Sequence, residues 1–157
     1  MARISAKQRE ENKTRFDNII FNALMTGEWH KVSYQYIADQ AGVNTRSTIQ
    51  GYYPHDIDFI AAIQGKVLPV FMSYLNFESL DSFVTSWTES LEEAKFLNIV
   101  SMLTGNMNAN AHALSIKGVS TLVEKIYALW GDEGYLAIEL LLGRTLLHIA
   151  GIRKQSL

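Results

Sequence analysis

Residues 32–53, VSYQYIADQAGVNTRSTIQGYY, contain the most informative pattern in the chain. Tyr34, Ile37 and Ala38 are spaced so that they share one face of a short helix. Gly42 stands where this helix must end, because glycine adopts a left-handed backbone without steric cost. A second short helix follows the turn. The stretch therefore predicts a helix-turn-helix.

The second helix of this motif, from residue 44 or 45 to residue 50 or 51, is rich in polar side chains. An arginine there can pair with the edge of guanine and a glutamine with that of adenine, and such a helix lies in the major groove of DNA. The same pattern also fits an ordinary helical corner with a solvated face, since such corners occur outside DNA-binding proteins. The side chains expected to point outward are Thr45, Arg46, Ser47, Thr48 and Gln50.

The flanking segments extend this pattern. An amphipathic helix that ends at Gly27 precedes it, and an aromatic corner and a further long apolar helix follow it. Taken together, residues 12–62 resemble the DNA-binding domain of the TetR family of transcriptional regulators. The residues that carry the resemblance are Ile37-Ala38, Ala41-Gly42-Val43 and Tyr52-Tyr53-Pro54.

The resemblance implies an all-α protein in two parts. Residues 1–54 form a three-helix helix-turn-helix head that binds DNA, and residues 55–157 form a helical bundle that senses a ligand and dimerises through its last two helices. It implies a homodimeric repressor that binds a palindromic operator in double-stranded DNA, with a small apolar effector. The side chains expected at the DNA are Lys31, Ser33, Thr45, Arg46, Ser47, Thr48, Gln50, Tyr52 and His55.

The chain departs from the family pattern at three places. One extra residue lies between Val43 and Thr48, Gln50 replaces the usual tyrosine, and Asp56 stands where a phosphate-contacting lysine is usual. An aspartate that faces a phosphate is repelled by it. The alternative is therefore a TetR-like helical dimer with weakened or lost DNA binding, which acts as a protein-interaction module.

Positive charge is concentrated at the amino terminus. This arm can contact phosphates, as basic arms ahead of helix-turn-helix units do. It is equally the solvated start of the first helix, with Ser5 and Gln8 spaced as a capping box. The basic residues concerned are Arg3, Lys7, Arg9, Lys13 and Arg15.

The rest of the chain also predicts helices, at about residues 55–74, 79–104 with a break near Glu92, 109–130 and 132–152. Pro69 lies inside the first of these and removes a backbone donor. The last helix is apolar on nearly every face, so it must be buried on every face. We expect it to pack against the body on one side and a second subunit on the other. Charged residues within it argue against a membrane span.

The body is rich in aromatic and methionine side chains. At helical spacing these pack a core, and they can also line an apolar pocket for an inducer in which a few polar groups set orientation. The residues expected to line such a pocket are Phe71, Phe83, Trp87, Met102, His112 and Tyr127.

Composition limits the remaining classes of function. The 157 residues carry a net charge of −2, so contact with a nucleic acid must come from a local patch. The chain has no cysteine, its four histidines are scattered, and no phosphate-binding loop or nucleophile motif is visible. The sequence therefore predicts no enzymatic activity, no metal and no cofactor. Polar residues at the start, in place of a secretory signal, predict a cytoplasmic protein.

Overall fold

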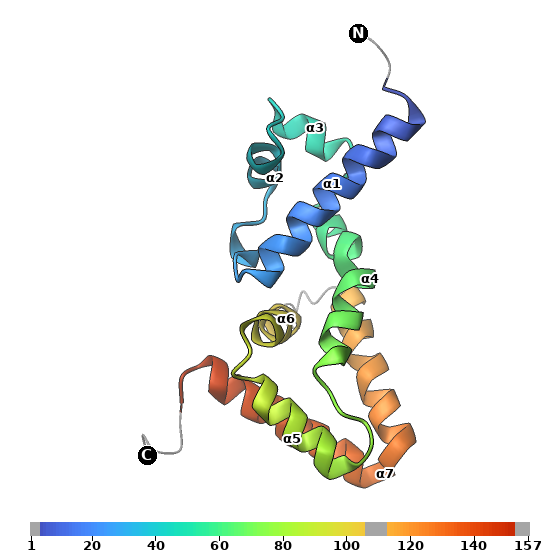
Figure 1. Ribbon diagram of the computed structural model, residues 1–157, viewed down its shortest axis with the longest axis vertical. Helices are drawn as coiled ribbons and strands as arrows, with labels where there is room; N and C mark the ends of the chain where they lie inside the picture. The colour runs from blue at the N-terminus through green and yellow to red at the C-terminus, as the bar shows by residue number, and fades with distance from the viewer. Residues whose placement is uncertain (1–3, 106–112, 153–157) are drawn as a thin grey trace. The chain divides into compact units, whose positions relative to one another are not determined.

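The computed structural model describes residues 4–105 and 113–152, and throughout these residues the regular secondary structure is helical (Figure 1). The all-α prediction is therefore confirmed. The chain divides into two compact units, Met1–Leu68 and Pro69–Leu157. Within the described residues, no helix is both long and apolar enough to cross a membrane.

Helix α1, Ala6–Met25, is the longest element of the first unit. It begins after Ser5, whose hydroxyl accepts a hydrogen bond from the backbone amide of Gln8. This is one half of the capping box that the sequence predicted; the Gln8 side chain donates instead to Oδ1 of Asn12 at 3.4 Å. The buried side of the helix carries Phe16, Ile20, Ala23 and Leu24.

The helix-turn-helix consists of α2, Tyr34–Ala41, and α3, Arg46–Gln50, after a short 3-10 turn, η1, Trp29–Lys31. Ser33 caps α2 by accepting from the amide of Tyr36, and Gly42 ends it with a φ of 62°. The glycine end of α2 therefore forms as the sequence predicted. Helix α2 packs against both α1 and α3.

Helix α4, Asp58–Ser73, contains Pro69. The second unit continues with α5, Leu80–Ser90, α6, Ala94–Gly105, and α7, Ala113–Ile149. The predicted break near Glu92 is thus the gap between α5 and α6. Both of these helices pack against α7.

Helix α7 is two helical segments joined at Gly131. The backbone there has φ 58° and ψ −140°, which interrupts the helix. This is a region that glycine enters without a steric penalty. The orange and red parts of α7 run in different directions in Figure 1. The division of the C-terminal region at Gly131 was predicted from the sequence.

Candidate nucleic-acid interface

Helix α3 presents one apolar side chain inward and its polar side chains outward. Ile49 is fully buried, whereas Arg46, Ser47, Thr48 and Gln50 are exposed. A five-residue helix does not hold its own shape in water, because helix nucleation is unfavourable. Burial of Ile49 and the contacts of the following corner therefore fix its position.

Hydroxyl groups cluster at the start of α3. The Oγ1 of Thr45 lies 2.9 Å from Oγ of Ser47 and 3.1 Å from Oγ1 of Thr48. Within the described part of the chain, Arg46 and Gln50 have no hydrogen-bond partner for their side chains. These two long side chains are therefore the ones in α3 that are free to reach a ligand, and both can form the bidentate contacts that distinguish bases.

Two other residues expected at DNA already have partners in the protein. Lys31 forms an ion pair with Glu28, with Nζ 2.7 Å from Oε1, and Tyr36 donates to Oε2 of Glu28 at 3.1 Å. The hydrogen bond from Lys31, followed by that from Tyr36, lowers the pKa of Glu28. Ser33 uses its hydroxyl to cap α2. Lys31 is nevertheless exposed, so its ammonium group remains accessible from the solvent.

Tyr52, the first residue of the aromatic corner, is held by α1. Arg9 lies over its ring at 5.0 Å from the centroid and donates through Nη2 to the carbonyl of Gly51 at 2.8 Å. Asn12 donates to the Tyr52 hydroxyl at 3.2 Å. Phe16 meets the ring edge to face, with centroids 5.0 Å apart. The tyrosine is thus half-buried, and its hydroxyl accepts a hydrogen bond within the protein.

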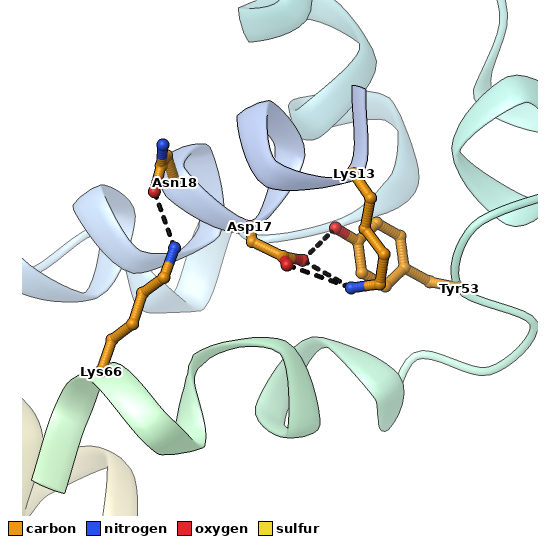
Figure 2. A network of polar contacts seen from close by, with 5 residues as sticks. All are labelled: Lys13, Asp17, Asn18, Tyr53 and Lys66. Atoms are coloured by element: carbon orange, nitrogen blue, oxygen red, sulfur yellow. Dashed lines mark hydrogen bonds and ion pairs between the residues drawn. The ribbon is translucent and has the colours of Figure 1, made fainter. Parts of the chain in front are cut away.

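Tyr53 is buried and lies beside the middle of α1 (Figure 2). Its hydroxyl donates to Oδ1 of Asp17 at 2.5 Å, and Lys13 bridges both carboxylate oxygens at 2.9 and 3.0 Å. The ammonium group of Lys13 also lies 5.0 Å from the centre of the Tyr53 ring. Burial, and then the hydrogen bond to Asp17, raise the pKa of Tyr53. Beside this group, Lys66 of α4 donates to Asn18 at 2.7 Å.

The residues after the corner begin α4. His55 is exposed, and its backbone amide donates to Oδ2 of Asp58 at 2.9 Å. The hydroxyl of Tyr34 donates a hydrogen bond to the carbonyl of Tyr53 at 3.0 Å. Loss of water around that hydroxyl, and then the nearby Asp56 carboxylate, raise the pKa of Tyr34. Asp56 itself is exposed.

Several basic residues of the amino-terminal arm have partners within the protein. Arg9 and Lys13 hold the corner, and Nη2 of Arg15 donates to the carbonyl of Ala41 at the end of α2. Lys7 is highly exposed, with only Glu11 at 4.0 Å. Arg3 lies outside the described residues.

Sequence reasoning missed Asn12 and Asp17 and assigned no structural role to the side chains of Arg9 and Lys13. These four residues, together with Phe16, lie three or four positions apart and so share one face of α1. That spacing is visible in the sequence. Its meaning depends on Tyr52 and Tyr53, which are about forty residues away and meet this face only in the folded unit.

Of the residues expected to line an inducer pocket, three form a closely packed ring cluster. Trp87 contacts Phe71 and Phe83 at centroid distances of 5.7 and 5.9 Å, and Phe96 at 5.5 Å. The indole Nε1 donates to Oγ1 of Thr145 at 3.0 Å. These rings and Met102 are buried, whereas Tyr127 is 53% exposed. His112 lies outside the described residues.

Among residues 4–105 and 113–152, no group of three histidine, aspartate or glutamate side chains is placed to hold a metal ion. A family model described as the tetracycline repressor LuxT C-terminal domain matches residues 64–149. The comparison with curated proteins finds no match.

Proposed function

This chain belongs to the family of the tetracycline repressor LuxT C-terminal domain and is a TetR-type regulator; we propose that it binds operator DNA as a homodimer and represses transcription. In this proposal residues 1–54 are the DNA-binding domain and residues 55–157 are the sensing and dimerisation body. The matched region, residues 64–149, lies wholly within this body, so the case for DNA binding depends on the head itself.

The single observation that carries the DNA-binding proposal is the pair of free side chains on α3. Arg46 and Gln50 are exposed on a helix that is anchored by Ile49 and follows a glycine turn. An arginine suits the O6 and N7 of guanine, and a glutamine suits the N6 and N7 of adenine. Thr45, Ser47 and Thr48 would add hydroxyl contacts to bases or phosphates.

The dimer proposal is supported by an apolar face of α7. After the break at Gly131, Ile138, Leu141 and Thr145 are buried, and the Trp87 indole of α5 bonds to Thr145. The intervening side chains leave a large apolar surface in water, which is typical of an association surface. The exposed apolar residues of this segment are Tyr135, Leu136, Leu140, Leu146, Leu147 and Ile149.

A two-fold dimer places two recognition helices at half-sites separated by about one helical turn, and it therefore requires a palindromic operator. Ligand control enters the proposal as a shift between two states of the body. A small apolar effector that entered the cluster of Phe71, Phe83 and Trp87 would have to separate these rings, which now contact one another.

A second candidate is a TetR-like dimer that acts through protein contacts with weak or absent DNA binding. The observation that favours it is Asp56, an exposed carboxylate just after the corner. Its charge opposes a nearby phosphate. The overall charge of −2 also gives no general attraction to DNA.

Selection of DNA from a random pool with the purified full chain separates the two candidates. The regulator predicts enrichment of a palindrome whose half-sites lie about one helical turn apart. No enriched sequence, together with undetectable binding at about 50 mM salt, would favour the protein-interaction module.

A further inference from the structure

We infer that Arg9 and Lys13 are positioning residues: they place the recognition helix through the tyrosine corner and do not act as phosphate contacts. The inference rests on the proposed DNA binding and assigns a different role to the basic arm. The corner here means Tyr52 and Tyr53, which directly follow Gly51, the residue that ends α3.

One face of α1 contacts this corner at several points. Arg9 and Asn12 bind the first tyrosine, and Lys13 and Asp17 bind the second. The contacts are of three kinds, namely hydrogen bonds, an ion pair and cations placed over aromatic rings. Such contacts stabilise a defined orientation, because each depends on the direction of a planar ring or of a donor.

Arg9 acts on the end of α3 itself. Its guanidinium group donates to the carbonyl of Gly51, so it places a positive charge at the carboxyl end of the helix, where cations are stabilising. Arg15 makes the equivalent contact with the carbonyl of Ala41 at the end of α2. The two arginines of α1 thus hold the ends of both helices of the helix-turn-helix.

The positive charge of Lys13 is likewise paired within the protein. Its ammonium group lies within 3.0 Å of both carboxylate oxygens of Asp17, whose side chain is 17% exposed. A phosphate would have to compete with this carboxylate for the same cation. Figure 2 shows the ammonium group, the carboxylate and the Tyr53 ring drawn together in one network.

Salt dependence distinguishes positioning from phosphate contact. Loss of a phosphate contact lowers the slope of log affinity against log salt by about one, because fewer counterions are released. For Arg9→Gln we expect about a tenfold loss of operator affinity at fixed salt with the wild-type slope retained. Lys7→Gln is the matched control, since it removes one charge from the same helix without touching the corner.

A double-mutant cycle tests whether Arg9 acts through Tyr52. If it does, Arg9→Gln combined with Tyr52→Leu will weaken operator binding by much less than the product of the two single effects. Independent effects that multiply, with a slope lowered by about one in Arg9→Gln, would overturn the inference and assign Arg9 to a phosphate.

Hydrogen exchange of the free protein gives a readout that needs no DNA. The amides of Gly51 and Tyr52 donate to the carbonyls of Ser47 and Ile49. We expect these amides to exchange faster in Arg9→Gln than in the wild type or Lys7→Gln, because the end of α3 opens more often. Unchanged exchange would contradict the inference. If the wild-type protein binds no operator, the proposed function fails. The exchange measurement then still decides whether Arg9 positions the end of α3.

Discussion

The hydroxyl of Tyr53 donates a 2.5 Å hydrogen bond to Oδ1 of Asp17, which joins the residue that ends the helix-turn-helix to the middle of α1. The tyrosine is almost wholly buried, and Lys13 neutralises the carboxylate that receives the bond. The position of the recognition helix relative to α1 therefore depends on a polar contact as well as on apolar packing.

Tyr53→Phe should lower the free energy of unfolding at pH 7 by about 1–2 kcal/mol, since it removes a hydrogen bond to a charged group and leaves the ring in place. Urea unfolding measures this change. Tyr127→Phe is the control, because Tyr127 is 53% exposed and its hydroxyl can bond to water. Equal midpoints for the wild type and Tyr53→Phe would show that the bond to Asp17 contributes nothing.

Alkaline pH should reveal the same contact. Burial and Asp17 raise the pKa of Tyr53 in the folded protein. The unfolded chain then loses this proton at a lower pH than the folded protein. The contribution of Tyr53 to the free energy of unfolding is therefore fully present below about pH 10, and above it falls by up to about 1.4 kcal/mol per pH unit for one proton. Unfolding measured between about pH 10 and 12 should show a shallower fall in Tyr53→Phe. Parallel curves for the two proteins contradict the assignment.

Gly42→Ala should destabilise the head by about 1–2 kcal/mol, because alanine is strained at a φ of 62°. Gly65→Ala is a matched control within α4. Neither glycine has an atom within 4 Å of the added methyl group, so steric bulk is equal at the two sites. Gly65→Ala should raise the free energy of unfolding by about 0.5–1 kcal/mol, because alanine is favoured over glycine in a helix interior. Thermal unfolding that gives the same sign for both variants would contradict the role of Gly42.

Leu140→Glu should produce a folded monomer. Leu140 is 66% exposed in the single chain and stands at the centre of the apolar face of α7. A buried carboxylate without a partner opposes association strongly. Sedimentation equilibrium at micromolar concentration should give about twice 17.7 kDa for the wild type and about 17.7 kDa for the variant. Thr85→Glu, on the exposed side of α5, should remain dimeric.

Arg46→Ala should cost about 1–3 kcal/mol of operator affinity and relax the preference at one base position. The reason is that Arg46 is exposed on α3 without a hydrogen-bond partner among the described residues. Competition binding with operators altered at single positions measures the effect. Lys95→Ala, which removes an exposed cation from α6, is the control. An unaltered base preference would exclude Arg46 from base recognition.

The helices and their ends could be predicted because short-range chemistry determines them. Ser5 and Ser33 cap the helices that follow them, and Gly42 and Gly131 have the positive φ values that end or break a helix. Each of these signals lies within four residues of its effect. The helical spacing of apolar residues likewise requires only local periodicity.

The partners of the polar side chains could not be predicted in the same way. The contact of Arg9 with Gly51 and that of Tyr53 with Asp17 join residues 42 and 36 positions apart. Basic residues at a chain start are compatible with a phosphate contact or with a carbonyl, and only the folded unit shows the carbonyl. For the same reason the exposure of Tyr127 was not foreseen, since aromatic composition does not tell which face of a helix is covered.

Whether the protein binds operator DNA as a dimer is tested by titrating the selected operator with the full chain, followed by fluorescence anisotropy, between about 50 and 200 mM salt. We expect saturation at two chains per palindrome, a steep loss of affinity with salt, and much weaker binding to a duplex with one scrambled half-site. Equal affinity for the operator and the scrambled duplex, or no saturable binding at about 50 mM salt, would contradict this expectation.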